Sequence, residues 1–251
     1  MNVRKIKKFT KKSKKAKNKL GIKLIKAIKK SDISLIETLI EKGVNVNSRD
    51  ERYKRSSLAW AVGVKKLKIV KLLIKSGADL NMQDRYGDTA LIIAVIYDYK
   101  DIAELLIKAG ADVNIQNNMG STALIEAISK HNRNIDIIKL LIKAKANLDI
   151  QDKEGKTALI WAAYLNDTQI AKLLIKNGSN VNLKDKNGDT ALIKAAFFGF
   201  EEIVKLLVEN GAKIDETNDD GKTAIDVAID KNLRQFLFEK LKQQKANNKK
   251  Q

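Results

Sequence analysis

The chain of 251 residues contains no cysteine and no proline, and it has a single histidine, His131. Without cysteine it forms neither disulfides nor thiolate metal sites. One histidine without cysteine also excludes the two-histidine and Cys/His ligand sets of zinc sites. No nucleophile–base set can be assembled around this histidine, and the glycines are spaced for turns and not for a phosphate loop. We therefore expect no enzymatic activity, no metal and no cofactor.

Long apolar runs are absent as well. No stretch approaches the roughly 18 uncharged apolar residues that a membrane-spanning helix requires. The N-terminus is rich in lysine but has no apolar run before residue 20, so it does not read as a secretory signal. We expect a monomer that is cytoplasmic.

A short phrase built on Gly-Ala-Asp-Val-Asn returns six times along the chain, at intervals of 33 to 35 residues. A period of this length is typical of a stacked array, because each unit is too small to bury its own apolar face. Function in such an array is carried by the exposed surface. The copies begin at Gly43, Gly77, Gly110, Lys145, Gly178 and Gly211.

A second phrase, Thr-Ala-Leu-Ile, keeps the same period. Its threonine is a predicted helix N-cap, and its leucine and the alanine three residues later form a narrow apolar stripe. A wider Ile-x-x-Leu-Leu stripe follows in the next predicted helix, and we assign all three side chains to the core. The glycine of the first phrase then ends that helix. The threonines are Thr89, Thr122, Thr157 and Thr190, with weaker copies at Ser56 and Thr223.

These phrases resemble the ankyrin repeat in order, phase and length over residues 20–240. The resemblance implies an all-α solenoid of about seven stacked ankyrin-like helix-turn-helix units with β-hairpin fingers. Alanine stands where that family has proline, and isoleucine replaces its histidine. We expect a basic disordered tail over 1–19, the solenoid over 20–242 and a basic tail over 243–251. The expected units are 20–47, 48–82, 83–115, 116–150, 151–183, 184–216 and 217–242.

The net charge of +19 is concentrated at the two ends. Residues 1–19 hold ten Lys/Arg and no acid, whereas 239–251 hold five lysines and Glu239, which leaves +5 for the rest. The N-terminal run is either a solubilising tail or a tether to nucleic acid or anionic membrane. The abundance of Lys, Asn and Ile is also what an AT-rich coding genome produces, which weakens any argument from lysine.

Arginine is scarcer, so its placement is more informative. Four of the seven arginines and two tyrosines fall in the first two predicted fingers, with Tyr53 and Tyr86 at equivalent tip positions. Arginine and tyrosine dominate many protein interfaces, and the arginine fork suits carboxylates. We expect these fingers to bind an acidic protein segment, with exposed charged turns as the alternative. The residues are Arg49, Arg52, Tyr53, Arg55, Arg85 and Tyr86.

A second candidate surface lies at the ends of the first helices of the repeats. In proteins that this chain resembles, these positions line a concave groove. Tyr97, Tyr164 and Phe197 are the candidate contact residues, and at least one of Phe197 and Phe198 is expected in the core. Trp60 and Trp161 are expected to pack rather than to contact a partner.

Together these features predict a non-catalytic protein–protein interaction scaffold that uses its fingers and groove. The proline-free style resembles ankyrin-repeat proteins of intracellular bacteria. This resemblance implies, as one role, an effector secreted into a host cell without a cleavable signal peptide. The alternative is a tethering protein whose basic N-terminal tail binds nucleic acid or anionic membrane.

Overall fold

The computed structural model describes residues 19–129 and 133–248. The chain divides into two compact units, Met1–Asn118 and Met119–Gln251. The predicted N-terminal tail lies outside the described residues except for Lys19, which is helical, and so does His131.

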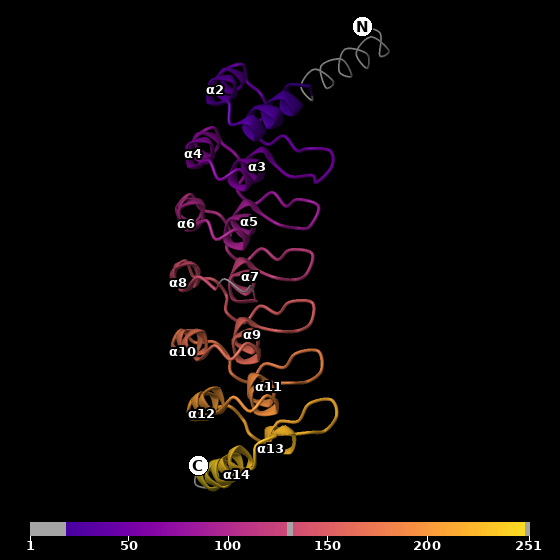
Figure 1. The fold of residues 1–251 in the computed structure, drawn as a ribbon, viewed down its shortest axis with the longest axis vertical. Coiled ribbons are helices and arrows are strands. Elements are labelled where there is room, and N and C mark those ends of the chain that lie inside the picture. Colours follow the sequence, from indigo (N-terminus) through magenta and orange to yellow (C-terminus); the bar gives the residue numbers. More distant parts are fainter. Residues whose placement is uncertain (1–18, 130–132, 249–251) are drawn as a thin grey trace. The chain divides into compact units, whose positions relative to one another are not determined.

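The first unit is built from antiparallel helix pairs joined by short turns. Its first row contains the helical residues 19–30, α3 (Ser57–Gly63) and α5 (Ala90–Ile96). Its second row contains α2 (Ile33–Glu41), α4 (Leu67–Lys75) and α6 (Lys100–Lys108). The loops between pairs project beyond the first row, on the side away from the second row (Figure 1). These loops are the fingers predicted from the sequence.

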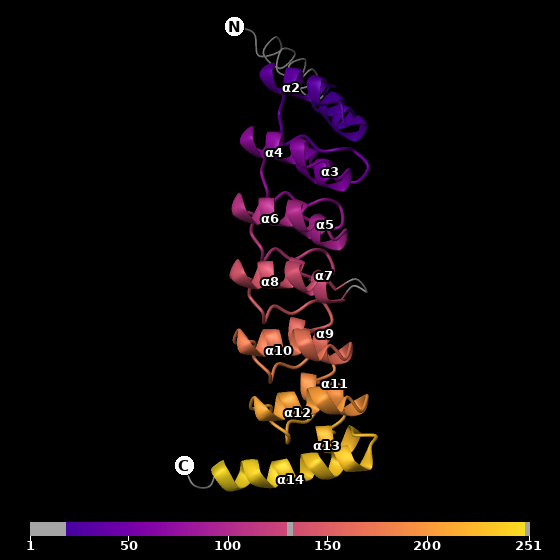
Figure 2. The same cartoon turned by 60° about the vertical axis from the view of Figure 1, so that its left-hand side comes forward.

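The second unit repeats the same arrangement with four pairs. They are α7 (Ala123–Ser129) with α8 (Ile135–Lys143), α9 (Ala158–Tyr164) with α10 (Thr168–Lys176), α11 (Ala191–Phe197) with α12 (Glu201–Glu209), and α13 (Ala224–Val227) with α14 (Lys231–Asn248). In Figure 2, α14 lies alongside α13 at the end of this unit. The helix pairs confirm the predicted all-α architecture of helix-turn-helix units.

The C-terminal boundary differs from the prediction of a tail over 243–251. Helix α14 continues to Asn248, and the side-chain amide of Gln244 donates to the Ala212 carbonyl at 2.9 Å. Leu233 and Leu237 of this helix are buried. The helix therefore covers the last repeat with one apolar stripe, and residues 243–248 continue a helix that is already anchored.

Helices of the first row begin where the sequence predicts. The hydroxyls of Thr89, Thr157 and Thr190 accept from the backbone N–H three residues later. Ser56 caps α3 in the same way, and Thr223 forms a complete capping box with Asp226. Each of these bonds satisfies a first-turn N–H that has no partner within its helix.

The core lies between the two rows of each unit. Leu91 and Ala94 of α5 are at most 1% exposed, and Ile69 and Leu73 of α4 are fully buried. The central leucine of each Ile-x-x-Leu-Leu triplet is only half-buried, as at Leu140, so its assignment to the core was wrong. It lies at the edge of the stripe, whereas the next leucine points between the rows.

Helix ends of the second row use left-handed residues, as expected for glycine at these positions. Gly77, Gly110, Gly178 and Gly211 have φ of 81°, 95°, 90° and 86°. Lys145 takes the same place in its repeat with φ 64°. A side chain in this conformation costs about 1–2 kcal/mol, so this repeat carries a local strain that the others avoid.

The fingers contain less β structure than predicted. Within the described residues, only two isolated antiparallel bridges occur, Arg49–Ser56 and Lys184–Thr190. Most finger N–H groups instead bond to the first side chain of the finger or to the neighbouring finger. For example, Asp152 Oδ1 accepts from the N–H groups of Glu154 and Lys156. The fingers are therefore tight turns stacked on one another and not hairpins with strands.

Candidate functional site

The finger tips of the first unit are held in register by backbone hydrogen bonds. The Arg85 N–H donates to the Tyr53 carbonyl at 2.7 Å, and the Asn118 N–H donates to the Tyr86 carbonyl at 2.9 Å. Tyr53 and Tyr86 are thus structurally equivalent, as the sequence predicted. Arg85, whose N–H donates to Tyr53, directly precedes Tyr86 in the chain.

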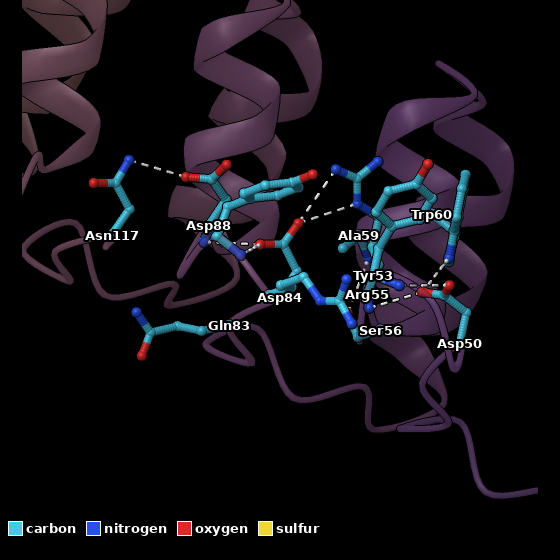
Figure 3. Close-up of polar contacts among 12 residues, drawn as sticks. Asp50, Tyr53, Arg55, Ser56, Ala59, Trp60, Gln83, Asp84, Asp88 and Asn117 are labelled. Atoms are coloured by element: carbon cyan, nitrogen blue, oxygen red, sulfur yellow. Dashed lines mark hydrogen bonds and ion pairs between the residues drawn. The ribbon is translucent and has the colours of Figure 1, made fainter. Parts of the chain in front are cut away.

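Asp50 organises the first finger. Its Oδ2 accepts from the N–H groups of Arg52 and Tyr53. Its Oδ1 accepts from the Arg55 N–H and, at 3.2 Å, from Nε1 of Trp60 (Figure 3). Burial alone would raise the pKa of Asp50, but these hydrogen bonds and the nearby Lys29 charge lower it below its usual value. An ionised Asp50 therefore holds the loop that presents the arginines.

Arg55 has a different role from the one predicted. Its Nε and Nη2 both lie 3.2 Å from Asp84 Oδ2 in the next finger (Figure 3). The Arg55 side chain is 17% exposed and the Asp84 side chain is 0% exposed. The guanidinium neutralises a buried carboxylate, so Arg55 joins two fingers and is not available as a partner contact.

The other predicted finger residues remain at the surface. Arg49 is exposed and donates through Nη1 to the Gln83 carbonyl at 2.8 Å. The Arg52 guanidinium carbon lies 5.1 Å from the centroid of the half-buried Tyr53 ring. Arg85 is exposed, and Tyr86 is 52% exposed. We call Arg49, Arg52, Tyr53, Arg85 and Tyr86 the arginine–tyrosine patch.

Positive charge is concentrated around this patch. Residues 19–82 hold fifteen Lys/Arg against six Asp/Glu, whereas 83–248 hold 23 against 24. Lys29 places its Nζ 3.7 Å from the Trp60 ring centroid, next to the first finger. Across the described part of the chain, neither Lys29 nor Arg52 has a carboxylate within salt-bridge distance. The patch is therefore cationic, since its charged members are all arginines.

Tyr97 belongs to a separate surface of the first unit. It is 52% exposed and stacks on Tyr99 with ring centroids 5.6 Å apart. Lys65 Nζ lies 4.8 Å from the Tyr99 centroid, and both residues line a cleft of about 290 Å³ at the turn between α5 and α6. Tyr97 is thus placed at a helix-pair turn and not on a finger.

In the second unit, Tyr164 and Phe197 are brought together by Phe198. The Phe198 centroid lies 5.4 Å from that of Tyr164 and 5.1 Å from that of Phe197, both edge to face. Tyr164, Phe197 and Phe198 are 41%, 53% and 39% exposed. The expectation that one phenylalanine is buried was wrong, because both lie at the C-terminal end of α11, where their side chains are exposed.

The two tryptophans are half-buried and have a role that the sequence did not reveal. Trp161 Nε1 donates to Asp152 Oδ2 at 2.8 Å, as Trp60 donates to Asp50. Lys194 occupies the same position of its repeat and lies 3.0 Å from Asp185 Oδ2. In these three repeats, the residue four places after the helix cap therefore ties its helix to its own finger. The sequence feature that could have revealed this role is an aspartate nine or ten residues before the tryptophan or lysine.

Lys194 is a half-buried charged group that contacts two carboxylates. Burial by itself lowers its pKa, but hydrogen bonds and charge from Asp189 and Asp185 outweigh burial and raise the pKa above its usual value. Asp189 also accepts from the Asn218 amide at 2.8 Å. Two carboxylates around one ammonium leave this cluster with one net negative charge.

The described residues show no grouping of side chains that points to catalysis through a bound metal. Residues 19–129 and 133–248 hold no cluster of three or more His, Asp or Glu placed to bind an ion. In the same ranges, none of the helices combines the length and apolar character needed to cross a bilayer.

Comparison with known proteins identifies the family. A family model described as ankyrin repeats (3 copies) matches residues 24–117, 110–185 and 165–250. Since these matches cover nearly the whole chain, the chain belongs to the ankyrin-repeat family. Its fold is similar to the crystal structure of the ankyrin repeat domain of Bcl-3, with a TM-score of 0.77 and 26% identity over 86% of this chain and 97% of that one.

Shorter sequence similarities extend to larger proteins. The chain is 38% identical over 73 residues to the human 2-5A-dependent ribonuclease and 37% identical over 73 residues to the mouse protein. It is 39% identical over 62 residues to an ankyrin repeat protein of Acanthamoeba polyphaga mimivirus. These matches cover 29%, 29% and 25% of this chain but only 10%, 10% and 8% of those proteins. They support the repeat family and carry no activity to this chain.

Proposed function

We propose that this protein is a non-catalytic scaffold whose arginine–tyrosine patch binds an acidic segment of a partner protein. Ankyrin repeats generally bind proteins, which gives the broad class. The observation that carries the specific proposal is the exposed series Arg52, Arg85 and Tyr86 on two fingers that a backbone hydrogen bond holds together.

The chemistry of the patch suits carboxylates. Arginine binds a carboxylate through two parallel N–H groups, and tyrosine contributes apolar area and a hydroxyl with little loss of side-chain freedom. Because the fingers are fixed to one another, little ordering energy is lost when a partner binds. The surrounding excess of Lys/Arg speeds the encounter with an acidic segment.

The other roles predicted from the sequence have less structural support. The tethering role depends on residues 1–19, of which 1–18 lie outside the described residues, and it stays a prediction. A bacterial origin and secretion into a host cell rest on composition alone and stay predictions. The relatives named above are human, murine and viral.

The proposal is tested by titrating the full chain with a labelled peptide rich in Glu and Asp that contains one tyrosine. Replacing Arg52, Arg85 and Tyr86 by alanine is expected to weaken binding more than about tenfold, since such residues often carry most of an interface's energy. The matched control changes Lys186 and Asn187 to alanine, which occupy the places of Arg85 and Tyr86 in another finger.

The control is expected to bind the acidic peptide as the wild type does. Equal weakening by both sets would show that general positive charge, and not the patch, attracts the peptide. Unchanged binding by the triple variant would overturn the proposal. If the chain instead bound DNA or anionic vesicles tightly, with affinity unaffected by the triple variant and falling steeply with salt, the tethering role would replace it.

A further inference from the structure

The second unit carries an exposed apolar surface that crosses three successive repeats. It begins with Tyr164 at the end of α9 and continues through Phe197 and Phe198 at the end of α11. Ile229, just after α13, is 69% exposed, and its Cδ1 lies 3.3 Å from where a Cβ on Gly199 would stand. We call Tyr164, Phe197, Phe198 and Ile229 the aromatic stripe.

A cleft of about 260 Å³ opens beside this stripe. Tyr164, Phe197 and Phe198 line one part of it, and Asp189 and Asp220 line another. Sites for small organic ligands usually measure about 300–1,000 Å³, so this cleft is suited to one or two side chains of a peptide. A contiguous apolar surface of this kind marks an interaction site more often than scattered exposed side chains do.

The cleft is lined by two aspartates, Asp189 and Asp220, and by two lysines, Lys194 and Lys222. Asp185, which pairs with Lys194, and Asp219, which precedes Asp220, make the charge around the cleft negative. Residues 213–230 hold six Asp/Glu against two lysines, Lys213 and Lys222. Lys213 lies within 3.3 Å of Glu216, which also binds Lys184. Asp219 and Asp220 are exposed, and no cationic side chain of the described residues lies within salt-bridge distance of either. The Lys194 cluster described above adds a further net negative charge.

The aromatic rings of this surface already hold a cation. Lys156 Nζ lies 4.6 Å from the Trp161 centroid and 5.4 Å from that of Tyr164. An aromatic face attracts cations because its electron density is negative. The exposed rings of Phe197 and Phe198 share the cleft with the carboxylates of Asp189 and Asp220. A second cation that approaches the rings is therefore attracted by the rings and by the carboxylates.

From this arrangement we infer that the aromatic stripe binds an extended basic segment of another protein, with an aromatic or large aliphatic side chain of that segment in the cleft. Its flanking Lys or Arg residues pair with Asp219 and Asp220. An acidic segment is disfavoured here, because it would face these carboxylates and the negative Lys194 cluster. This surface is therefore selective for the opposite charge from that proposed for the arginine–tyrosine patch.

The test measures binding of three labelled synthetic peptides to the full chain by fluorescence anisotropy. The first combines Lys and Arg with one central Phe, the second has Ala in place of Phe, and the third has Glu in place of each Lys and Arg. The first is expected to bind at least about tenfold more tightly than the second, since truncating a buried aromatic anchor costs at least this much.

Two variants and one matched control locate the site. Tyr164→Ala with Phe197→Ala, and separately Asp220→Lys, are each expected to weaken binding of the first peptide about tenfold or more. Asp220→Lys reverses an exposed charge and leaves the core unchanged, so weaker binding by this variant cannot be attributed to unfolding. Tyr97→Ala removes a tyrosine of similar exposure, 52%, at the corresponding turn of the first unit, and is expected to leave binding unchanged.

Three outcomes would overturn the inference. The first is equal binding of the Phe peptide by the wild type and both variants. The second is tighter binding of the Glu peptide that depends on Phe197. The third is concentration-dependent self-association in sedimentation that both variants abolish, which would make the occupant a second copy of this chain, for instance its basic residues 1–18. None of these outcomes involves Arg52, Arg85 or Tyr86, so the proposed function stands or fails separately.

Discussion

Arg55 and Arg52 lie on the same finger and have similar chemistry, yet the structure gives them opposite roles. Arg55 neutralises Asp84, whose side chain is fully buried, whereas Arg52 is exposed and contacts the Tyr53 ring. Leaving a buried charge without its partner is far more costly than removing an exposed one. Arg55 is therefore part of a structural ion pair, whereas Arg52 is a candidate binding contact.

We predict that Arg55→Met lowers the free energy of unfolding by about 3–5 kcal/mol, because Asp84 is left buried without its counter-charge. Arg52→Met, the control, is expected to change it by less than about 1 kcal/mol. Urea unfolding measures both. Adding Asp84→Asn to Arg55→Met should recover part of the loss. A stable Arg55→Met variant would return Arg55 to the list of partner contacts.

Asp50 supplies a pH-dependent contribution to stability. The pKa of Asp50 is held below its ordinary value by hydrogen bonds that outweigh the effect of burial. Its contribution is therefore fully present above the pKa of the unfolded chain, about 3.9, and is lost as pH falls through the lower folded pKa.

We expect Asp50→Asn to destabilise the protein near neutral pH and the difference from wild type to shrink below about pH 4. Urea unfolding at a series of pH values gives this difference directly. Glu51→Gln, an exposed neighbour on the same finger, is the control and should show little difference at any pH. A difference for Asp50→Asn that is constant with pH would show that geometry alone, and not ionisation, holds the loop.

At the scale of the elements, each finger depends on the next one along the chain. A Cβ on Gly155 would stand 2.7 Å from the Lys186 backbone nitrogen, whereas Gly221, in the last finger, has no such neighbour within 4 Å. The two glycines have nearly the same φ, 74° and 73°. Comparing substitutions at the two glycines therefore distinguishes the cost of backbone strain from the cost of disturbing the stacked fingers.

Gly155→Ala is predicted to destabilise the protein more than Gly221→Ala. Both pay the left-handed strain of about 1–2 kcal/mol, and only Gly155→Ala adds an overpacking cost of about 1–3 kcal/mol. Thermal or urea unfolding of the two variants supplies the comparison. Equal losses would mean that the fingers move apart freely and that their backbone hydrogen bonds contribute little.

At the scale of the whole molecule, charge is distributed unevenly along the chain. Among residues 19–248, the excess of Lys/Arg lies in 19–82, whereas 83–248 are nearly neutral. Like charges crowded into two repeats repel one another, and salt screens this repulsion over about 10 Å at 0.1 M. This repulsion destabilises the first two repeats, which carry the surface that we propose binds acidic partners.

Raising the salt concentration from low to physiological values is expected to slow hydrogen exchange in residues 19–82 more than in 83–248. Exchange detected by mass spectrometry resolves the two regions within one sample, so the second region is an internal control. A uniform change, or slower exchange mainly in 83–248, would argue that the basic repeats are not strained by their charge.

Much of this molecule was predictable because it repeats. The caps at Thr89 and Thr190, the left-handed Gly211 and the equivalence of Tyr53 with Tyr86 all follow from local chemistry or from one period. Contacts that cross periods did not follow. Arg55 reaches Asp84 across 29 residues, and this contact leaves no periodic pattern in the sequence.

The amino-acid sequence by itself determined the repeat, its helix boundaries and the apolar stripes, since capping, turn conformation and burial act over a few residues. Only the tertiary structure decided which exposed side chains are available to a partner. Arg55 is occupied by a carboxylate, the middle leucines are half-exposed, and Phe197 and Phe198 both face outward. The reason is that exposure and ion pairing depend on which neighbour covers a side chain, and that neighbour belongs to another repeat.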